Sequence, residues 1–117
     1  MKIFVLKSKI HKARVSSKNI NYTGSITIDK ELMDKAGLFP YERVDIYDID
    51  NGERFTTYVL EGRKGKKDII LNGAAARRVE IGDKIIIAAY TMIDSNEEFT
   101  PKVIILDKNN NITIEET

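Results

Sequence analysis

Short runs of β-branched residues, separated by turn residues, recur along the whole chain and constrain its fold more than any other feature. Such runs are typical of strands, and the gaps between them leave room for little helix. The chain has 117 residues and no Pro-, Gly- or Ser-rich linker, so we expect one domain over residues 1–117. The predicted strands cover residues 3–6, 13–16, 25–28, 44–49, 54–60, 68–71, 84–90, 102–106 and 112–114.

Turn and helix signals divide these runs. Residues 50–52, Asp-Asn-Gly, predict a tight hairpin because Asn and Gly tolerate positive φ, and residues 107–111 predict another turn. One helix is predicted between Asp29, which can cap its start, and Gly37, which can end it in the left-handed conformation. A second, shorter helical turn is predicted at residues 73–77.

The run at residues 85–89, Ile-Ile-Ile-Ala-Ala, has no polar face. A strand of this kind is buried on both sides, which favours a closed or nearly closed barrel over an open sheet with one wet face. Pattern and composition therefore predict a small, mainly β barrel of six to eight strands with one or two short helices. They do not by themselves indicate a function.

Composition excludes several kinds of site. The chain has no cysteine and a single histidine, His11, so disulfides, thiolate zinc sites and cysteine nucleophiles are excluded and no metal centre is expected. A net charge of +1 gives no support to a nucleic-acid partner, and no apolar stretch is long enough to span a membrane. Residues 1–28 carry lysines and arginines but no acid, which suits either a small anionic ligand or a solvated strand face.

Tyr22-Thr23-Gly24-Ser25 lies where a loop enters a predicted strand. A Gly-Ser bond suits an N-to-O acyl shift, because Gly24 has no Cβ and can adopt a strained conformation that leaves its carbonyl open to the Ser25 hydroxyl. Elimination across Ser25 would then release residues 1–24 and leave a pyruvoyl group at the start of residues 25–117. Taken alone, a Gly-Ser pair is more often an ordinary turn.

Four motifs follow one another along the chain: Lys9-Ile10-His11, Tyr22-Thr23-Gly24-Ser25, Asn51-Gly52-Glu53-Arg54-Phe55-Thr56-Thr57-Tyr58 and Asn72-Gly73-Ala74-Ala75-Ala76. With these motifs, the chain resembles the bacterial, self-processing aspartate 1-decarboxylases over about residues 1–93. The resemblance implies a double-psi β-barrel, a homotetramer with active sites between neighbouring subunits, and a cytoplasmic enzyme of pantothenate biosynthesis.

The resemblance also implies the chemistry. L-aspartate would form a Schiff base with the pyruvoyl group made from Ser25 and lose carbon dioxide to give β-alanine, with no metal and no pyridoxal phosphate. The residues implied are Ser25 and Tyr58 for catalysis; Gly24, Ser25, Thr57, His11 and Tyr22 for processing; and Lys9, Arg54, Thr57, Asn72, Gly73, Ala74 and Ala75 for substrate binding.

The strand with Arg54 adds independent detail, because side chains repeat every two residues along a strand. Arg54 and Tyr58 should share one face, where a guanidinium suits a substrate carboxylate and a phenol suits proton donation. Lys9 could hold the second carboxylate as a point charge. Thr57 should point to the other face, so its contact with Gly24 would require a bulge or a subunit boundary.

Two alternatives remain open. One is a pyruvoyl decarboxylase that acts on another acidic amino acid, such as glutamate. The other is a non-enzymatic, nucleic-acid-binding barrel that uses residues 63–67, Arg77 and Arg78 as a basic patch, although the near-zero net charge argues against it. Residues 63–67 are otherwise interpreted as a solvated hairpin tip, and the Arg77-Arg78 pair is more basic than the resemblance predicts.

Overall fold

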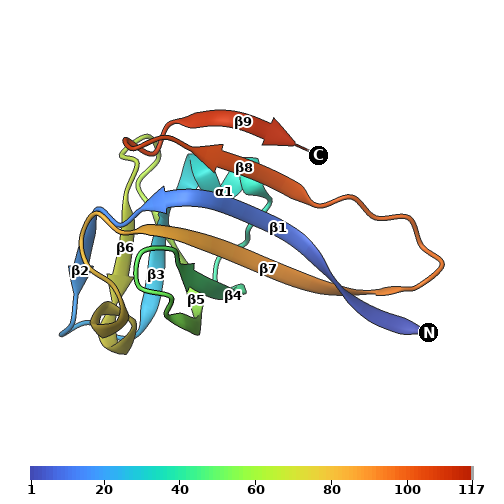
Figure 1. The fold of residues 1–117 in the computed structure, drawn as a ribbon, viewed down its shortest axis with the longest axis horizontal. Helices are drawn as coiled ribbons and strands as arrows, with labels where there is room; N and C mark the ends of the chain where they lie inside the picture. The colour runs from blue at the N-terminus through green and yellow to red at the C-terminus, as the bar shows by residue number, and fades with distance from the viewer. Residues whose placement is uncertain (117) are drawn as a thin grey trace.

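All strands of the computed structural model, which describes residues 1–116, join in one mixed sheet (Figure 1). The order of the nine strands is β2-β6-β3-β5-β4-β7-β1-β8-β9. The elements are β1 (Lys2–Arg14), β2 (Ser17–Asn19), β3 (Ser25–Asp29), α1 (Lys30–Ala36), β4 (Arg43–Asp48), β5 (Arg54–Gly62), β6 (Ile69–Asn72), the 3₁₀ helix η1 (Gly73–Arg78), β7 (Lys84–Asp94), β8 (Lys102–Leu106) and β9 (Ile112–Glu116).

The sheet closes into a barrel because β1 continues directly into β2. β1 pairs with β7, whereas β2 pairs in parallel with β6 at the far end of the strand order. At the junction, the Ser16 amide donates to the Ile69 carbonyl over 2.9 Å and the Val15 amide to the Asp83 carbonyl over 3.0 Å. The predicted mainly β barrel with short helices is confirmed. The ring from β2 to β1 contains seven strands, within the predicted six to eight, and in residues 1–116 β8 and β9 extend the sheet from β1 outside this ring to nine strands.

The first strand differs from its prediction. Residues 3–6 and 13–16 were expected as two strands, whereas β1 runs from Lys2 to Arg14 without a break. The polar residues between them carry no strand pattern, but β7 on one side and β8 on the other supply hydrogen-bond partners. Register shifts between Leu6 and Ser8 and between Ile10 and Ala13 accommodate the irregular stretch.

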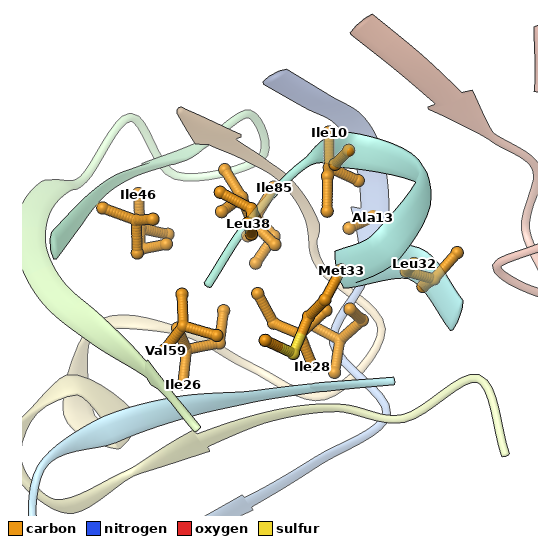
Figure 2. Close-up of a cluster of buried hydrophobic side chains, with 14 of the residues drawn as sticks. Ile10, Ala13, Ile26, Ile28, Leu32, Met33, Leu38, Ile46, Val59 and Ile85 are labelled. Carbon is orange, nitrogen blue, oxygen red and sulfur yellow. The ribbon is translucent and has the colours of Figure 1, made fainter. Parts of the chain in front are cut away.

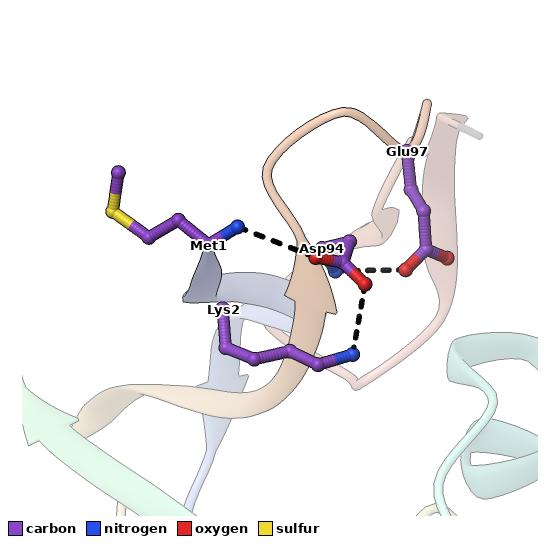
Figure 3. Close-up of polar contacts among 4 residues, drawn as sticks. All are labelled: Met1, Lys2, Asp94 and Glu97. Carbon is purple, nitrogen blue, oxygen red and sulfur yellow. Dashed lines mark hydrogen bonds and ion pairs between the residues drawn. The ribbon is translucent and has the colours of Figure 1, made fainter.

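β1 and β7 extend beyond the barrel as a two-stranded arm, which lengthens the molecule to 43 × 27 × 25 Å (Figure 1). Polar contacts hold its end (Figure 3). The Met1 amine lies 3.4 Å and the Lys2 amine 3.0 Å from the Asp94 carboxylate, and the Asp94 amide donates to Glu97 over 2.7 Å. Such exposed pairs contribute little stability each, but they fix the register at the tip of the arm.

Helix α1 closes one end of the barrel. Leu32, Met33 and Ala36 form its buried face and pack with isoleucines of the strands (Figure 2). The Asp29 carboxylate accepts the Glu31 amide over 2.8 Å, and Gly37 ends the helix at φ 73°, so both predicted caps are confirmed. Within residues 1–116, no helix is long and apolar enough to cross a membrane.

The predicted hairpin at residues 50–52 is present and rests on a buried acid. Asp48 is only 2% exposed, and one of its carboxylate oxygens accepts the amides of Asp50 and Asn51 over 2.8 and 3.2 Å. Its other oxygen is buried without a partner within residues 1–116. Burial, followed by the nearby Asp83 carboxylate, raises the pKa of Asp48 to about 6.

Because the Asp48 pKa is raised on folding, the folded state binds a proton that the unfolded state releases between about pH 4 and pH 6. The contribution of Asp48 to the free energy of unfolding is therefore fully present below about pH 4 and is lost as pH rises through about pH 6. Asp48→Asn keeps the acceptor for the hairpin amides and mimics the protonated acid. We expect it to raise the free energy of unfolding at pH 8 by roughly 1–3 kcal/mol and to flatten its pH dependence, measured by urea denaturation. A variant less stable than wild type at pH 8 would contradict this assignment.

Candidate active site

A groove opens where the ladder between β3 and β5 stops. The first pair in that ladder is Ile26 with Val59, so the preceding part of β5 is paired with β4 on one side only. Continuing the same parallel register would place Ser25 beside Tyr58 and Gly24 beside Thr57. The groove at this free edge is lined by Gly24, Phe55, Thr56, Thr57, Tyr58, Ala74, Ala75 and Arg78.

Ser25 begins β3 and is completely buried. It lies opposite Asn72 in the β3–β6 ladder, and the Asn72 side-chain amide donates to the Ser25 hydroxyl over 2.9 Å and to the Thr27 hydroxyl over 3.1 Å. Because the Ser25 oxygen acts as the acceptor in this bond, its own hydrogen remains available for another partner. The side chain is thus held beside the peptide bond that joins it to Gly24.

Gly73 packs directly against the backbone before Ser25. Its φ is 66°, and a Cβ added there would lie 2.6 Å from the Gly24 nitrogen, 2.7 Å from the Gly24 Cα and 2.8 Å from the Tyr22 carbonyl oxygen. These are backbone atoms, which cannot swing away as a side chain does. Gly73 is therefore required both by its conformation and by the close approach of the Tyr22–Gly24 segment.

Thr57 and Tyr58 lie on opposite faces of β5, as predicted, yet both line the groove. Of the two expected explanations, a bulge is not needed here, because the β4–β5 register runs without a shift. At an unpaired strand edge, side chains from both faces border the same opening. Tyr58 is 37% exposed, so its hydroxyl is accessible from solvent.

Arg54 lies in an adjoining depression rather than in the groove. This depression is lined by Asp45, Tyr47, Arg54, Phe55 and Thr56, the last two of which also border the groove. The Arg54 guanidinium stacks 4.0 Å from the centre of the Tyr47 ring. Burial, followed by a hydrogen bond with Tyr90, raises the Tyr47 pKa to about 12.

Lys9 and His11 do not reach this groove within the chain. Both lie on β1, paired with β8 and, for Lys9, with β7, and neither is among the groove residues. Burial, then the charges of Lys9 and Lys12, lower the His11 pKa, which favours a neutral imidazole. Tyr22 is exposed in the loop before Gly24, and it borders the site only through its backbone contact with Gly73.

Three groove residues were not among the predicted site residues: Phe55 and Thr56, which belong to the central motif, and Arg78. Arg78 donates to the Glu53 carboxylate over 2.7 Å, and its carbonyl accepts the Asn51 side chain over 2.8 Å. In the sequence, only the unusually basic Arg77-Arg78 pair indicated a role for Arg78, and the direction of the Arg78 side chain depends on how η1 packs.

The site contains the residues expected where a reactive group is formed from the atoms of the chain itself, without a bound cofactor. A buried serine with a fixed hydroxyl follows a glycine that borders the groove, which suits attack on the Gly24 carbonyl. Acidic side chains close enough to share a metal, Asp48, Asp50 and Asp83, lie outside the groove. Asp50 is also engaged by the Lys84 amine over 3.2 Å.

Comparisons with known proteins point to one family. The family model described as aspartate decarboxylase matches residues 1–113. Proteins named aspartate 1-decarboxylase match with 56% identity over 112 residues in Thermosipho africanus, covering 96% of this chain and 93% of that protein. The corresponding values are 58% over 114 residues in Clostridium botulinum strain 657, covering 96% and 90%, and 54% over 114 residues in Wolinella succinogenes, covering 96% and 94%.

A solved structure of the computationally designed msDPBB_sym2 protein, a double-psi β-barrel design, matches with a TM-score of 0.44 and 19% identity. The match covers 73% of this chain and 96% of the designed one.

Gly73→Ala tests the close approach at the site. We expect the added methyl group to displace the Tyr22–Gly24 segment, to cost roughly 1–3 kcal/mol of stability and to slow any cleavage at Gly24 by at least about tenfold. Gly52→Ala is the matched control, since Gly52 has φ 76° but nothing within 4 Å of an added Cβ. Melting temperature and intact mass measure the two effects, and equal behaviour of both variants would refute the steric role of Gly73.

Proposed function

Because this chain belongs to the aspartate decarboxylase family, we propose that it converts L-aspartate into β-alanine and carbon dioxide after cleaving itself between Gly24 and Ser25. In this role it would supply β-alanine to cytoplasmic pantothenate synthesis. The observation that carries the proposal is the buried Ser25, whose hydroxyl is held by Asn72 at the end of a groove bordered by Gly24.

The proposed processing uses groups of the chain itself and one water. The Ser25 hydroxyl attacks the Gly24 carbonyl, the C–N bond breaks and an ester replaces the peptide. Loss of the Ser25 α-proton then expels the Gly24 carboxylate and leaves a dehydroalanine, which water hydrolyses to a pyruvoyl group and ammonia. Asn72 orients the nucleophile, and Gly73 holds Gly24 in place by direct backbone packing.

The pyruvoyl group supplies a ketone that can condense with the amine of an amino acid and withdraw electrons while carbon dioxide leaves. The residues present fit such a group, because the buried Ser25 directly follows Gly24, which borders the groove, and the small side chains of Ala74 and Ala75 line the same groove. Tyr58 is the proposed proton donor to the carbon that has lost its carboxylate, and Thr57 borders the same space.

Arg54 and Lys9 are the proposed carboxylate ligands, with the planar guanidinium suited to a bidentate contact. Neither borders the groove of its own chain. We therefore propose a homotetramer in which a neighbouring subunit completes each site, consistent with the exposed aromatic side chains of Phe4 and Phe39. Sedimentation equilibrium would test the assembly, since a monomer that decarboxylates aspartate would rule it out.

Self-cleavage and substrate choice test the proposed function together. The purified protein should separate into fragments of residues 1–24 and 25–117, the larger of which is blocked to Edman degradation, and it should release β-alanine from aspartate. Ser25→Ala should stay intact and inactive because it lacks the nucleophile. A wild-type chain that remains whole after prolonged warm incubation would refute the proposal, and faster turnover of glutamate than of aspartate would change the substrate.

Tyr58→Phe separates the two chemistries of the site. The ring keeps its volume and only the hydroxyl is lost, so we expect complete cleavage at Gly24 but decarboxylation slowed by roughly 10²–10⁴, the usual contribution of a positioned general acid. Tyr41→Phe is the control, because Tyr41 is exposed and does not border the groove. Normal turnover in Tyr58→Phe would remove Tyr58 from the mechanism, and failure to cleave would assign it to processing.

A further inference from the structure

A second groove, which shares no lining residue with the candidate active site, lies where β1 passes into β2. The loop between β5 and β6, the turn before β7 and the turn between β8 and β9 form its other walls. It is lined by Arg14, Val15, Ser16, Lys66, Lys67, Asp68, Ile81, Gly82, Lys108, Asn109 and Asn110. We refer to it below as the basic groove.

Four cations line the basic groove, Arg14, Lys66, Lys67 and Lys108, against one acid, Asp68. Within residues 1–116, none of the four forms an ion pair with an acidic side chain. The nearby Asp107 carboxylate already accepts three hydrogen bonds from Asn109 and Asn111. The concave surface therefore keeps an excess of positive charge.

Arg14 points most directly to a ligand. Its Nε is buried and has no hydrogen-bond partner within the described part of the chain. A buried donor without an acceptor is rare in folded proteins, since it has lost its water without a replacement. Because Arg14 lines the basic groove, an anion there would accept hydrogen bonds from its guanidinium, which matches the geometry of a phosphate group.

The backbone that carries these cations is fixed before any ligand arrives. The buried Asn110 side chain accepts the Arg14 amide over 2.7 Å and donates to the carbonyls of Arg14 and Lys67 over 2.9 and 3.0 Å. The Asp29 carboxylate accepts the amides of Gly65 and Lys67 over 3.0 and 2.6 Å. The loop is thus held on both sides. Residues 63–66 are exposed, as the sequence predicts, but they do not form a hairpin tip, because β3 lies between β5 and β6 in the sheet.

We propose that the basic groove is a binding site for a small phosphate-bearing anion. Four unpaired cations on a held scaffold suit a compact, multiply charged group. The net charge of +1 and the confinement of the cations to one concavity disfavour an extended polynucleotide. Arg63 and Lys64 belong to the same loop but do not line the groove, so they provide matched controls.

Calorimetric titration of the processed protein with pyrophosphate, and separately with inorganic phosphate, tests the proposal at constant ionic strength. The double variant Lys66→Gln/Lys108→Gln should bind pyrophosphate at least about tenfold more weakly, because charge-assisted contacts are lost. Arg63→Gln/Lys64→Gln removes the same charge outside the groove and should bind as wild type does. Arg14→Gln keeps the backbone bonds to Asn110 and should also weaken binding.

Backbone NMR shifts should locate the pyrophosphate at residues 14–16, 66–68 and 108–110. No binding by the wild type at about 10 mM pyrophosphate would overturn the proposal, as would equal weakening in both double variants, which signals only diffuse charge attraction. Shifts centred elsewhere, or an oligonucleotide that binds more tightly than pyrophosphate and covers a wider surface, would also overturn it. These results are independent of whether the protein decarboxylates aspartate.

Discussion

The hydrogen bonds on both sides of β6 are the interaction on which the rest of the structure depends. β6 pairs in parallel with β2 on one side and antiparallel with β3 on the other. Because β2 directly follows β1 in the chain, this pairing closes the barrel. The same strand delivers Asn72 opposite both Asn19 and Ser25. The pairing of β6 that closes the barrel therefore also orients the Ser25 hydroxyl. Without β2 beside β6, the loop before Gly24 would lose its support.

The candidate active site exists because one ladder stops early. β3 and β5 pair from Ile26 and Val59 onward, which leaves the first half of β5 with a free edge. Unpaired strand edges usually expose backbone groups that invite association, so proteins cover or use them. Here η1 and the segment before Ser25 border the edge, and the absence of a Cβ at Gly73 allows the backbones to approach closely.

Buried polar side chains organise the turns of this disulfide-free chain. Asp29 caps α1 and also holds the loop between β5 and β6, while Asn110 joins the end of β1 to that same loop. Asp48 accepts two backbone amides of the hairpin between β4 and β5 and so fixes that turn. Each replaces several water contacts of backbone groups with protein contacts, which explains how short irregular connections hold definite positions in so small a domain.

The sequence by itself determined most strand positions from β3 onward, the caps of α1 at Asp29 and Gly37, the hairpin at residues 50–52 and the motif around Gly24 and Ser25, because each follows from neighbours along the chain. It also indicated that Thr57 and Tyr58 face opposite ways. Only the tertiary structure decided that both border one groove, that β1 is continuous, that Arg78 joins the groove and that Lys9, His11 and Arg54 do not. The physical reason is that the end of a ladder and the partner of a strand edge depend on residues far away in the sequence. No local pattern of side chains encodes them.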